Sequence, residues 1–289
     1  MKTYREILKE ADEKRVAIGH FNFATIEVAH AIVAAAKELD VPVLLGTTEG
    51  EHDFVGLHEA VALAKSLRTT YDHPIYLNAD HHYSLETVKQ AIDAGFDSVI
   101  FDGAKLPFEE NMKITKECVA YARASGRDVI IEGELGYIGG SSQVRDALPD
   151  GVAVTEELMT TPEEASRFVE ATGIDMLAPA VGNVHGMLRN APEPRLHPER
   201  VSAIKEAAGI PLVLHGASGN TDQDLTDCIT AGISIVHINT ELRRAWRDAL
   251  AKHITDKPDD VAPYKVLKEA REEAQKVVAG RLKVFNRLS

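Results

Sequence analysis

The sequence predicts one (β/α)8 barrel, and three observations lead to that prediction. Eight short apolar runs alternate with amphipathic helical segments along nearly all of the 289 residues. Most runs are rich in Val, Ile and Leu, as parallel strands buried on both faces should be. Several runs have a histidine or a carboxylate at or just past their C-terminal end, where such barrels build their sites. We therefore expect a single barrel domain over residues 1–289, with a helical extension at about 264–282.

The predicted strands are short and bounded by turn residues or by helix-like segments. Their apolar runs are too brief for helices, which favours buried strands of a parallel sheet. They are expected at residues 16–22, 42–47, 75–80, 98–103, 128–134, 176–182, 211–216 and 235–240.

The segments between the strands have helical periodicity and several clear boundaries. Thr161-Pro162-Glu163-Glu164 forms a capping box with proline at the first helical position. Glycine follows the last helical residue in pairs such as Ala94-Gly95. The C-terminal extension would be unstable alone, so we expect it on the outside of the barrel or on a partner subunit. The helices are expected at residues 26–39, 57–67, 85–94, 109–123, 163–171, 198–208, 222–231, 241–254 and 264–282.

One segment, residues 136–155, interrupts this alternation after the fifth predicted strand. It is rich in glycine and has little helical pattern. Long irregular loops inside compact domains are usually functional or disordered. At the carboxyl face of a barrel we expect this one to act as a mobile lid.

Composition excludes several classes of partner. The formal net charge is −13, which argues against nucleic acid and anionic membranes as partners. No run approaches the ~20 apolar residues of a membrane span, and the N-terminus has no apolar signal core. Cys118 and Cys228 lie in helical patterns and are expected to be buried, reduced thiols. We expect a cytoplasmic protein.

Three histidines follow apolar runs, and together they predict a metal site. They are His81, His185 and His215, each at or just past a strand end. Three imidazoles that meet at one face would bind a catalytic metal ion and leave one coordination position open. A single histidine in such a place would more often be a hydrogen-bonded loop residue, but three on three strand ends are a stronger signal.

Carboxylates accompany these histidines. Asp80 precedes His81, where it could perform acid–base chemistry on a substrate hydroxyl or simply cap the next helix. Adjacent strand residues point to opposite faces, so both can reach one site only if the backbone turns there. Asp102 follows the fourth strand, and Glu132 and Glu134 share one face of the fifth. One of these glutamates could bind metal and the other support a ligand, or either could pair with a barrel lysine or arginine.

Glycine-rich turns follow the last strands. Gly186 follows His185, Gly216-Ala217-Ser218-Gly219 follows His215, and His237-Ile238-Asn239-Thr240 closes the eighth strand. Loops after strands seven and eight of such barrels commonly bind phosphate, although ordinary strand-to-helix turns also contain glycine. No predicted strand contains a lysine, which weakens a Schiff-base mechanism.

Six motifs in this order resemble the class II, zinc-dependent ketose-bisphosphate aldolases of the fructose- and tagatose-bisphosphate type. The resemblance covers essentially the whole chain. The motifs are DHH (80–82), FDGAKLPFEEN (101–111), EGELGYIGG (132–140), APAVGNVHG (178–186), PLVLHGASG (211–219) and INTELR (238–243).

The resemblance implies reversible aldol cleavage of a ketose (bis)phosphate, such as fructose 1,6-bisphosphate, to dihydroxyacetone phosphate and an aldehyde. It implies that His81, His185 and His215 bind Zn²⁺ and that Asp80 handles the proton of the C4 hydroxyl. Asp102 and Glu134 would serve an alternative or second divalent position, and a monovalent cation is also compatible. The expected assembly is a homo-oligomer, a dimer or tetramer. The residues implied to contact substrate are Gly186, Gly216, Ala217, Ser218, His237, Ile238, Asn239 and Thr240, with Thr48 and Asn22 nearby.

Two departures leave the substrate open. The family usually has asparagine where His237 stands, and lysine where Ile235 stands. It also often has an acid after the paired glycines of the lid, where this chain has Ser141-Ser142-Gln143, with Asp146 as the nearest acid. The alternatives are another metal-dependent barrel enzyme for a phosphorylated sugar, or a non-catalytic sugar-phosphate binder. Asp80 argues against the binder, which would need no acid–base group.

Overall fold

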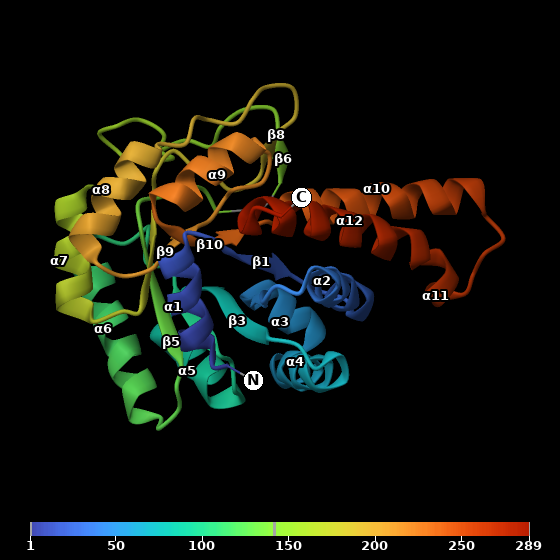
Figure 1. Cartoon of the computed structure of the whole chain (residues 1–289), viewed down its shortest axis with the longest axis horizontal. Coiled ribbons are helices and arrows are strands. Elements are labelled where there is room, and N and C mark those ends of the chain that lie inside the picture. Colours follow the sequence, from blue (N-terminus) through green and yellow to red (C-terminus); the bar gives the residue numbers. More distant parts are fainter. Residues whose placement is uncertain (1, 141–142, 289) are drawn as a thin grey trace.

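A computed structural model describes residues 2–140 and 143–288 as a closed barrel of eight parallel strands (Figure 1). The order around the barrel is β1-β10-β9-β7-β5-β4-β3-β2, so the strands follow one another in chain order. The predicted (β/α)8 barrel is confirmed. Its strands are β1 (Ile18–Asn22), β2 (Val43–Thr48), β3 (Ile75–His82), β4 (Ser98–Phe101), β5 (Ile130–Leu135), β7 (Met176–Pro179), β9 (Leu212–Leu214) and β10 (Ile233–His237).

Helices surround the barrel and follow its strands. The predicted helices are present with small shifts at their ends, and two further helices, α1 and α3, were not predicted. The helices are α1 (Tyr4–Lys14), α2 (Ile26–Leu39), α3 (Glu49–Val55), α4 (Leu57–Tyr71), α5 (Leu85–Ala94), α6 (Phe108–Ala124), α7 (Pro162–Thr172), α8 (Pro198–Ala208), α9 (Asp222–Ala231), α10 (Thr240–Asp256), α11 (Pro263–Val266) and α12 (Lys268–Asn286).

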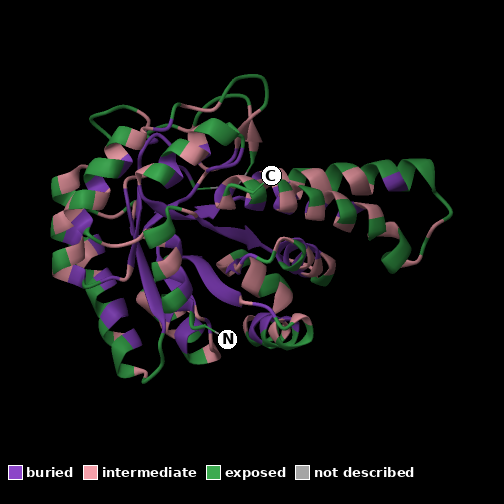
Figure 2. Cartoon of the chain, in the orientation of Figure 1, coloured by how far each residue is buried: buried purple, intermediate pink, exposed green. Residues whose placement is uncertain are grey.

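The strands are buried almost throughout because side chains fill the barrel and helices cover it (Figure 2). Helix α1 packs its apolar face, which includes Tyr4, Ile7 and Leu8, against inward-facing strand residues such as Leu44 and Ile235. This helix begins with a Thr3–Glu6 capping box, which is a signal that the sequence already contains. With one end of the barrel filled by this apolar cluster, the polar strand ends at the other face remain for a site.

The long connection after β5 is more ordered than a simple irregular loop. It contains β6 (Val144–Arg145), which pairs in parallel with β8 (Met187–Leu188) from the loop after β7. The backbone N–H of His185 also donates to the carbonyl oxygen of Ile138. Backbone hydrogen bonds therefore join the two loops next to His185. Ser141 and Ser142, part of the predicted lid, lie outside the described residues.

The C-terminal helices form an arm that projects from the barrel (Figure 1). Helix α10 leads outward, α11 lies at the tip, and α12 returns along α10. The second half of α12 packs on the barrel, with Leu282 and Phe285 fully buried and the Phe285 carbonyl accepting from Ala17 N–H. The extension thus packs on the outside of the barrel, as one of the two expected arrangements, and α12 runs beyond the predicted end. Among the described residues, no helix is long and apolar enough to cross a membrane.

Candidate active site

The cavity at the carboxyl ends of the strands has a volume of about 260 Å³. It collects three of the six predicted catalytic and metal-binding residues, Asp80, His81 and His185. Its lining consists of Asn22, Thr48, Glu49, Gly50, Asp80, His81, Tyr83, Gly140, His185, Asn239 and Arg243.

A local distortion of β3 brings Asp80 and His81 to the same cavity. His81 adopts a left-handed backbone conformation, with φ of 48°. The pairing of β3 with β4 shifts register between Ala79 and His82, so an irregularity lies between them. A non-glycine residue in this region of φ/ψ space costs about 1–3 kcal/mol and persists only where the surroundings impose it. The backbone turn that the sequence required for both side chains to reach one site is therefore present, within the strand rather than beyond it.

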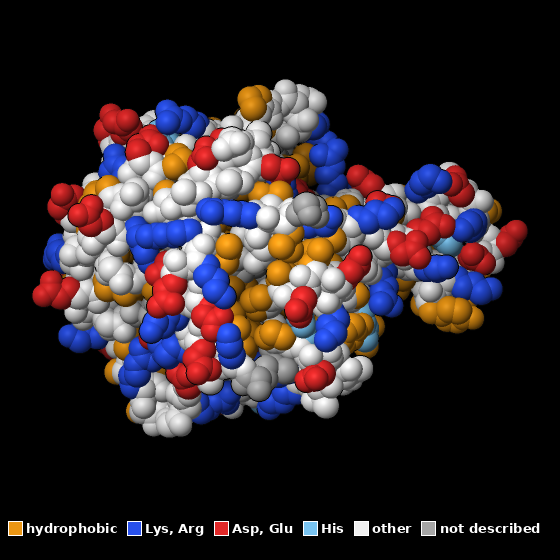
Figure 3. Space-filling view, in the orientation of Figure 1, with side chains coloured by type: hydrophobic (Ala, Val, Ile, Leu, Met, Phe, Trp, Pro, Cys, Tyr) orange, Lys and Arg blue, Asp and Glu red, His pale blue; other side chains and the backbone are white. Residues whose placement is uncertain are grey.

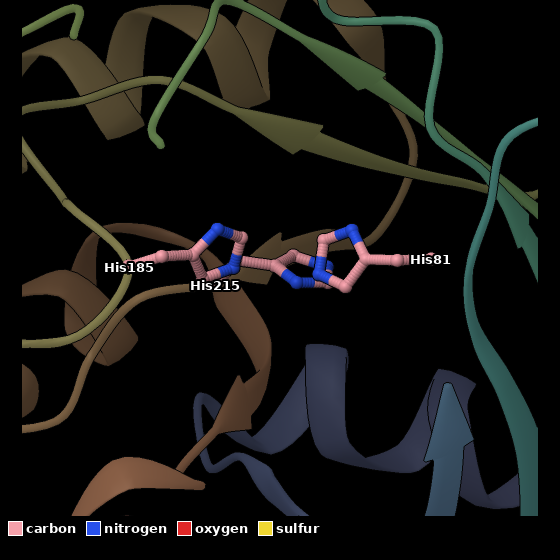
Figure 4. Close-up of side chains that lie close together, drawn as sticks. All are labelled: His81, His185 and His215. Atoms are coloured by element: carbon pink, nitrogen blue, oxygen red, sulfur yellow. The ribbon is translucent and has the colours of Figure 1, made fainter. Parts of the chain in front are cut away.

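The three histidines converge from three different segments (Figure 4). The ring centroid of His81 lies 4.8 Å from that of His185 and 4.8 Å from that of His215. One nitrogen from each ring lies within 4.8 Å of the others. All three side chains are nearly or fully buried, and the rings meet edge to face, so their nitrogens can point toward one ion.

Each of these imidazoles has one nitrogen held by a hydrogen bond, which fixes the nitrogen that remains free. His81 Nδ1 lies 3.0 Å from Asp102 Oδ2, and His185 Nδ1 donates to the Gly139 carbonyl oxygen at 2.7 Å. His215 Nε2 lies 2.7 Å from Glu132 Oε1, which leaves its buried Nδ1 without a hydrogen-bond partner. Metal-binding histidines are usually oriented by such carboxylate or carbonyl partners. The three free nitrogens therefore fit a metal ion.

Glu132 and Glu134, which were predicted to share one face of the strand, have different surroundings. Glu132 holds His215, whereas Glu134 Oε2 lies 3.6 Å from His81 Nδ1 and has no hydrogen-bond partner. Together with Asp102, Glu134 and His81 form a second group with the composition of a metal site. Neither glutamate pairs with a lysine or arginine among the described contacts, so the alternative ion-pair role receives no support.

The carboxylates and histidines shift each other's pKa values. Burial disfavours the charged form of His81, but Asp80, Asp102 and Glu134 outweigh it and raise the pKa of His81 to about 10. Burial also disfavours the ionised form of Asp80. His81, His237 and His20 nevertheless hold the pKa of Asp80 well below its usual value. Asp80 is therefore ionised at neutral pH, as a residue that accepts a proton must be.

The glycine-rich loops that were predicted to bind phosphate line a small hollow that adjoins the cavity and shares His185 and Asn239 with it. Gly216 has φ of 61°, and a Cβ there would lie 2.6 Å from the Val184 backbone, so only glycine fits. Ala217 and Ile238 do not line either space, because their side chains are buried in the core. The remaining lining of the hollow is Gly186, Gly216, Ser218, His237 and Thr240.

Comparison with known proteins agrees with this geometry. Residues 2–288 match the family model described as fructose-bisphosphate aldolase class-II. The chain belongs to this family. The fructose-bisphosphate aldolase of Geobacillus stearothermophilus is 37% identical to this class II aldolase over 97% of the chain and 95% of the relative.

Solved structures of similar proteins have the same fold as this aldolase. A structure named as a fructose-1,6-bisphosphate aldolase from Coccidioides immitis superposes with a TM-score of 0.82 at 32% identity, covering 98% of this chain and 96% of that one. The YdjI aldolase from Escherichia coli K12 superposes with a TM-score of 0.80 at 28% identity, covering 99% and 97%.

His237 does not stand alone in this aldolase. Its ring stacks on His20 with a centroid distance of 3.5 Å and an interplanar angle of 8°, and lies 3.9 Å from the His215 ring. His20 Nε2 in turn lies 3.1 Å from Asn78 Nδ2. A Cβ at Gly46 would lie 2.3 Å from the His20 ring, so this glycine makes room for it. The sequence reasoning missed His20, although its position two residues before Asn22 puts both on one strand face.

The surroundings of His237 determine its protonation state. Burial and the neighbouring His20 and His215 hold the pKa of His237 well below its ordinary value, against the opposing effect of Asp80. His237 is therefore neutral at pH 7, and we expect its effect on substrate to come from its size and position.

Proposed function

We propose that this class II aldolase reversibly cleaves a ketose (bis)phosphate to dihydroxyacetone phosphate and an aldehyde. Fructose 1,6-bisphosphate, the substrate in the names of its relatives, is the reference substrate. The observation that carries the proposal is the meeting of three anchored histidines and an ionised Asp80 in a cavity next to glycine-rich phosphate loops.

The metal ion would be Zn²⁺ on His81 Nε2, His185 Nε2 and His215 Nδ1, the nitrogens that internal hydrogen bonds leave free. When bound, such an ion supplies Lewis-acid polarisation of the substrate's ketone and hydroxyl oxygens. We further propose that Asp102 and Glu134 serve a second or alternative divalent position, because Glu134 has an unpartnered buried oxygen beside His81. The predicted monovalent cation stays a prediction.

Asp80 would carry the proton at C4. Its Oδ2 accepts from Asn22 Nδ2 at 2.9 Å, while its buried Oδ1 has no hydrogen-bond partner and is free for a substrate hydroxyl. In cleavage Asp80 takes the proton of the C4 hydroxyl group and the C3–C4 bond breaks. The electron pair of that bond stays on C3 of the dihydroxyacetone phosphate fragment. In condensation Asp80 returns the proton to the aldehyde oxygen. Asp146 is exposed and pairs with Arg189 at 2.9 Å, away from the cavity lining, so the group that protonates C3 is not assigned.

Removing one histidine tests the metal and the activity together. We expect wild-type protein to contain close to one equivalent of zinc and to release triose phosphate from fructose 1,6-bisphosphate in a coupled assay, with loss of activity after chelation. His215→Ala should lose most metal and turnover, since it removes both a ligand and the partner of Glu132. Stoichiometric metal and full turnover in His215→Ala, by elemental analysis and the same assay, would show that the assignment is wrong.

Replacing His237 tests substrate choice. His237→Asn removes the ring that stacks on His20 and opens the hollow beside Asn239 and Thr240. We expect the ratio of kcat/KM values among ketose phosphates to change while zinc remains bound. The measurement is a panel of ketose phosphates assayed with both proteins. Identical profiles would mean that His237 is a tolerated replacement without influence on specificity.

We also propose that the chain is a single domain that works as a cytoplasmic homo-oligomer. Buried, free Cys118 and Cys228 are compatible with a reducing compartment. The tip of the arm exposes Val261 and Tyr264, at 87% and 78% of their surface, as an apolar patch over α11 that a second subunit could cover (Figure 3).

A further inference from the structure

One part of the cavity is built from the end of β2, the start of α3 and one side chain of α10. We call it the distal end, and it consists of Thr48, Glu49, Gly50 and Arg243. The cavity shares His185 and Asn239 with the hollow, and Asp80 lies in its lining. Thr48 of the distal end is the register partner of Asp80 between β2 and β3. A substrate with its triose phosphate in the hollow and its C4 hydroxyl at Asp80 would therefore extend its remaining carbons past Asp80 toward the distal end.

Four donors around the distal end point to one internal carboxylate, Glu51. Glu51 Oε2 accepts from Asn22 Nδ2 at 2.9 Å, from Thr48 N–H at 2.9 Å and from Thr48 Oγ1 at 3.2 Å. Glu51 Oε1 accepts from Arg243 Nη2 at 2.6 Å. An amide, a backbone N–H, a hydroxyl and a guanidinium are the groups with which proteins bind a phosphate. In this chain Glu51 already uses them, and its side chain is only 12% exposed.

The charges that remain at the distal end are negative. Arg243 is the one lysine or arginine in the described lining of the cavity, and its charge is paired with Glu51. Glu49 also lines this end, where its Oε1 accepts from Tyr83 N–H at 3.2 Å. Lys105 lies near Gly140 and Tyr137 on the lid side and does not line the cavity. A second phosphate placed here would meet carboxylates without a free cation.

We propose that the distal end selects ketose 1-phosphates whose far end carries hydroxyl groups rather than a second phosphate, and that Glu51 determines this specificity. The proposal rests on the proposed aldolase function and names the class of substrate for the same site. Hydroxyl groups suit the distal end because they can donate to Glu49 and accept from Arg243 without adding charge.

A matched pair of substrates tests the proposal. The substrates are fructose 1-phosphate and fructose 1,6-bisphosphate, which differ only in the distal phosphate, and the measurement is kcat/KM for each by coupled detection of triose phosphate. Wild-type protein should prefer the monophosphate. Glu51→Gln should raise the bisphosphate-to-monophosphate ratio by about ten- to a hundredfold, the size expected for charge-assisted hydrogen bonds that become available to the phosphate. The gain should appear mainly as a lower KM for the bisphosphate.

A stability check and two further variants keep the result interpretable. Glutamine also suits this capping position, so α3 should persist in Glu51→Gln, which thermal unfolding checks. Asp53→Asn removes one negative charge from an exposed position on the same helix and should leave the ratio unchanged. Adding Arg243→Met to Glu51→Gln should reverse the gain, because it removes the cation that the variant frees.

The outcomes separate this proposal from the aldolase function. A wild-type preference for the bisphosphate, an unchanged ratio in Glu51→Gln, or an equal gain in Asp53→Asn would overturn the role of Glu51 while cleavage itself remains. Failure of the wild-type protein to release triose phosphate from either substrate would overturn the proposed function and this inference with it.

Discussion

Asp80→Ala should lower turnover by at least about a hundredfold while zinc stays bound. That factor is typical of a lost general acid–base group and corresponds to about 2.7 kcal/mol of barrier height. The hydrogen bonds that orient the metal-site histidines come from Asp102, Gly139 and Glu132, and none comes from Asp80. Metal content should therefore be close to normal. The measurements are kcat and KM by coupled assay, with elemental analysis of the same preparation.

Asp80→Asn is the matched variant. An asparagine oxygen can still accept from Asn22, so the shape of the site is kept and only the basic carboxylate is lost. Its turnover should fall as far as that of Asp80→Ala. Loss of zinc from both variants would instead make Asp80 an organiser of the metal site, since its Oδ1 lies 3.7 Å from His81 Nε2. Near-normal turnover in Asp80→Asn would exclude a proton-transfer role.

The fold could be predicted because its signals are local. Apolar runs of strand length alternate with helical segments. Consecutive parallel strands must be joined by a crossover, which is usually a helix, so eight such units predict the barrel. Helix α3 was missed because it is short and contributes no apolar side chain to the core, so its sequence has no apolar periodicity. Thr48 and Glu51 nevertheless form a capping box that signals where the helix begins. The lid strands β6 and β8 are two residues each and depend on a contact between two loops, which no local pattern encodes.

The site residues could be predicted only where histidines and carboxylates stand at the ends of predicted strands. His81, His185 and His215 were identifiable in that way, and so were the carboxylates next to them. Glu51 and Arg243 were not, because they lie in different helices far apart in sequence and meet only through tertiary packing. The stacking of His20 on His237 has the same origin, since β1 and β10 become neighbours only when the barrel closes. Such pairs decide the shape and charge of the cavity, which is why the distal end became visible only in the structure.

The buried histidines should make the metal-free protein unusually sensitive to mild acid. Burial, together with neighbouring histidines, lowers the pKa of His20 to about 4 and that of His82 and His185 to about 3. His237 is shifted in the same direction. The unfolded chain binds these protons near the ordinary value of about 6.5, whereas the folded chain excludes them. Stability therefore falls as pH decreases from 6.5 toward 4.

The opposite shifts cancel only part of this effect in that window. Burial and neighbouring carboxylates raise the pKa of Glu134 well above its usual value, so the folded chain already holds a proton that the unfolded chain takes up only near pH 4.5. Glu134 therefore offsets about one of the four protons. The pKa of His81 is raised to about 10, so its stabilising contribution is complete below pH 6.5 and is lost only as pH rises toward 10. Lowered pKa values of Asp80 and Asp102 cost stability only when pH falls below about 4. Each excluded proton changes the unfolding free energy by about 1.4 kcal/mol per pH unit, so the net three could remove about 4 kcal/mol per unit. Typical domains have only about 5–15 kcal/mol, and unfolding is expected near pH 5.

Urea unfolding of chelator-treated protein between pH 7.5 and 4.5 would measure this loss. The pH dependence of the unfolding free energy should correspond to about three protons taken up on unfolding below pH 6. His82→Phe, at a buried position outside the cavity lining and beside His52, should reduce that number by one. Added zinc should lessen the loss, because it binds only the folded site and stabilises it by mass action. A free energy independent of pH over this range would mean that the folded protein accepts these protons, and that the buried imidazoles are not held in their neutral form.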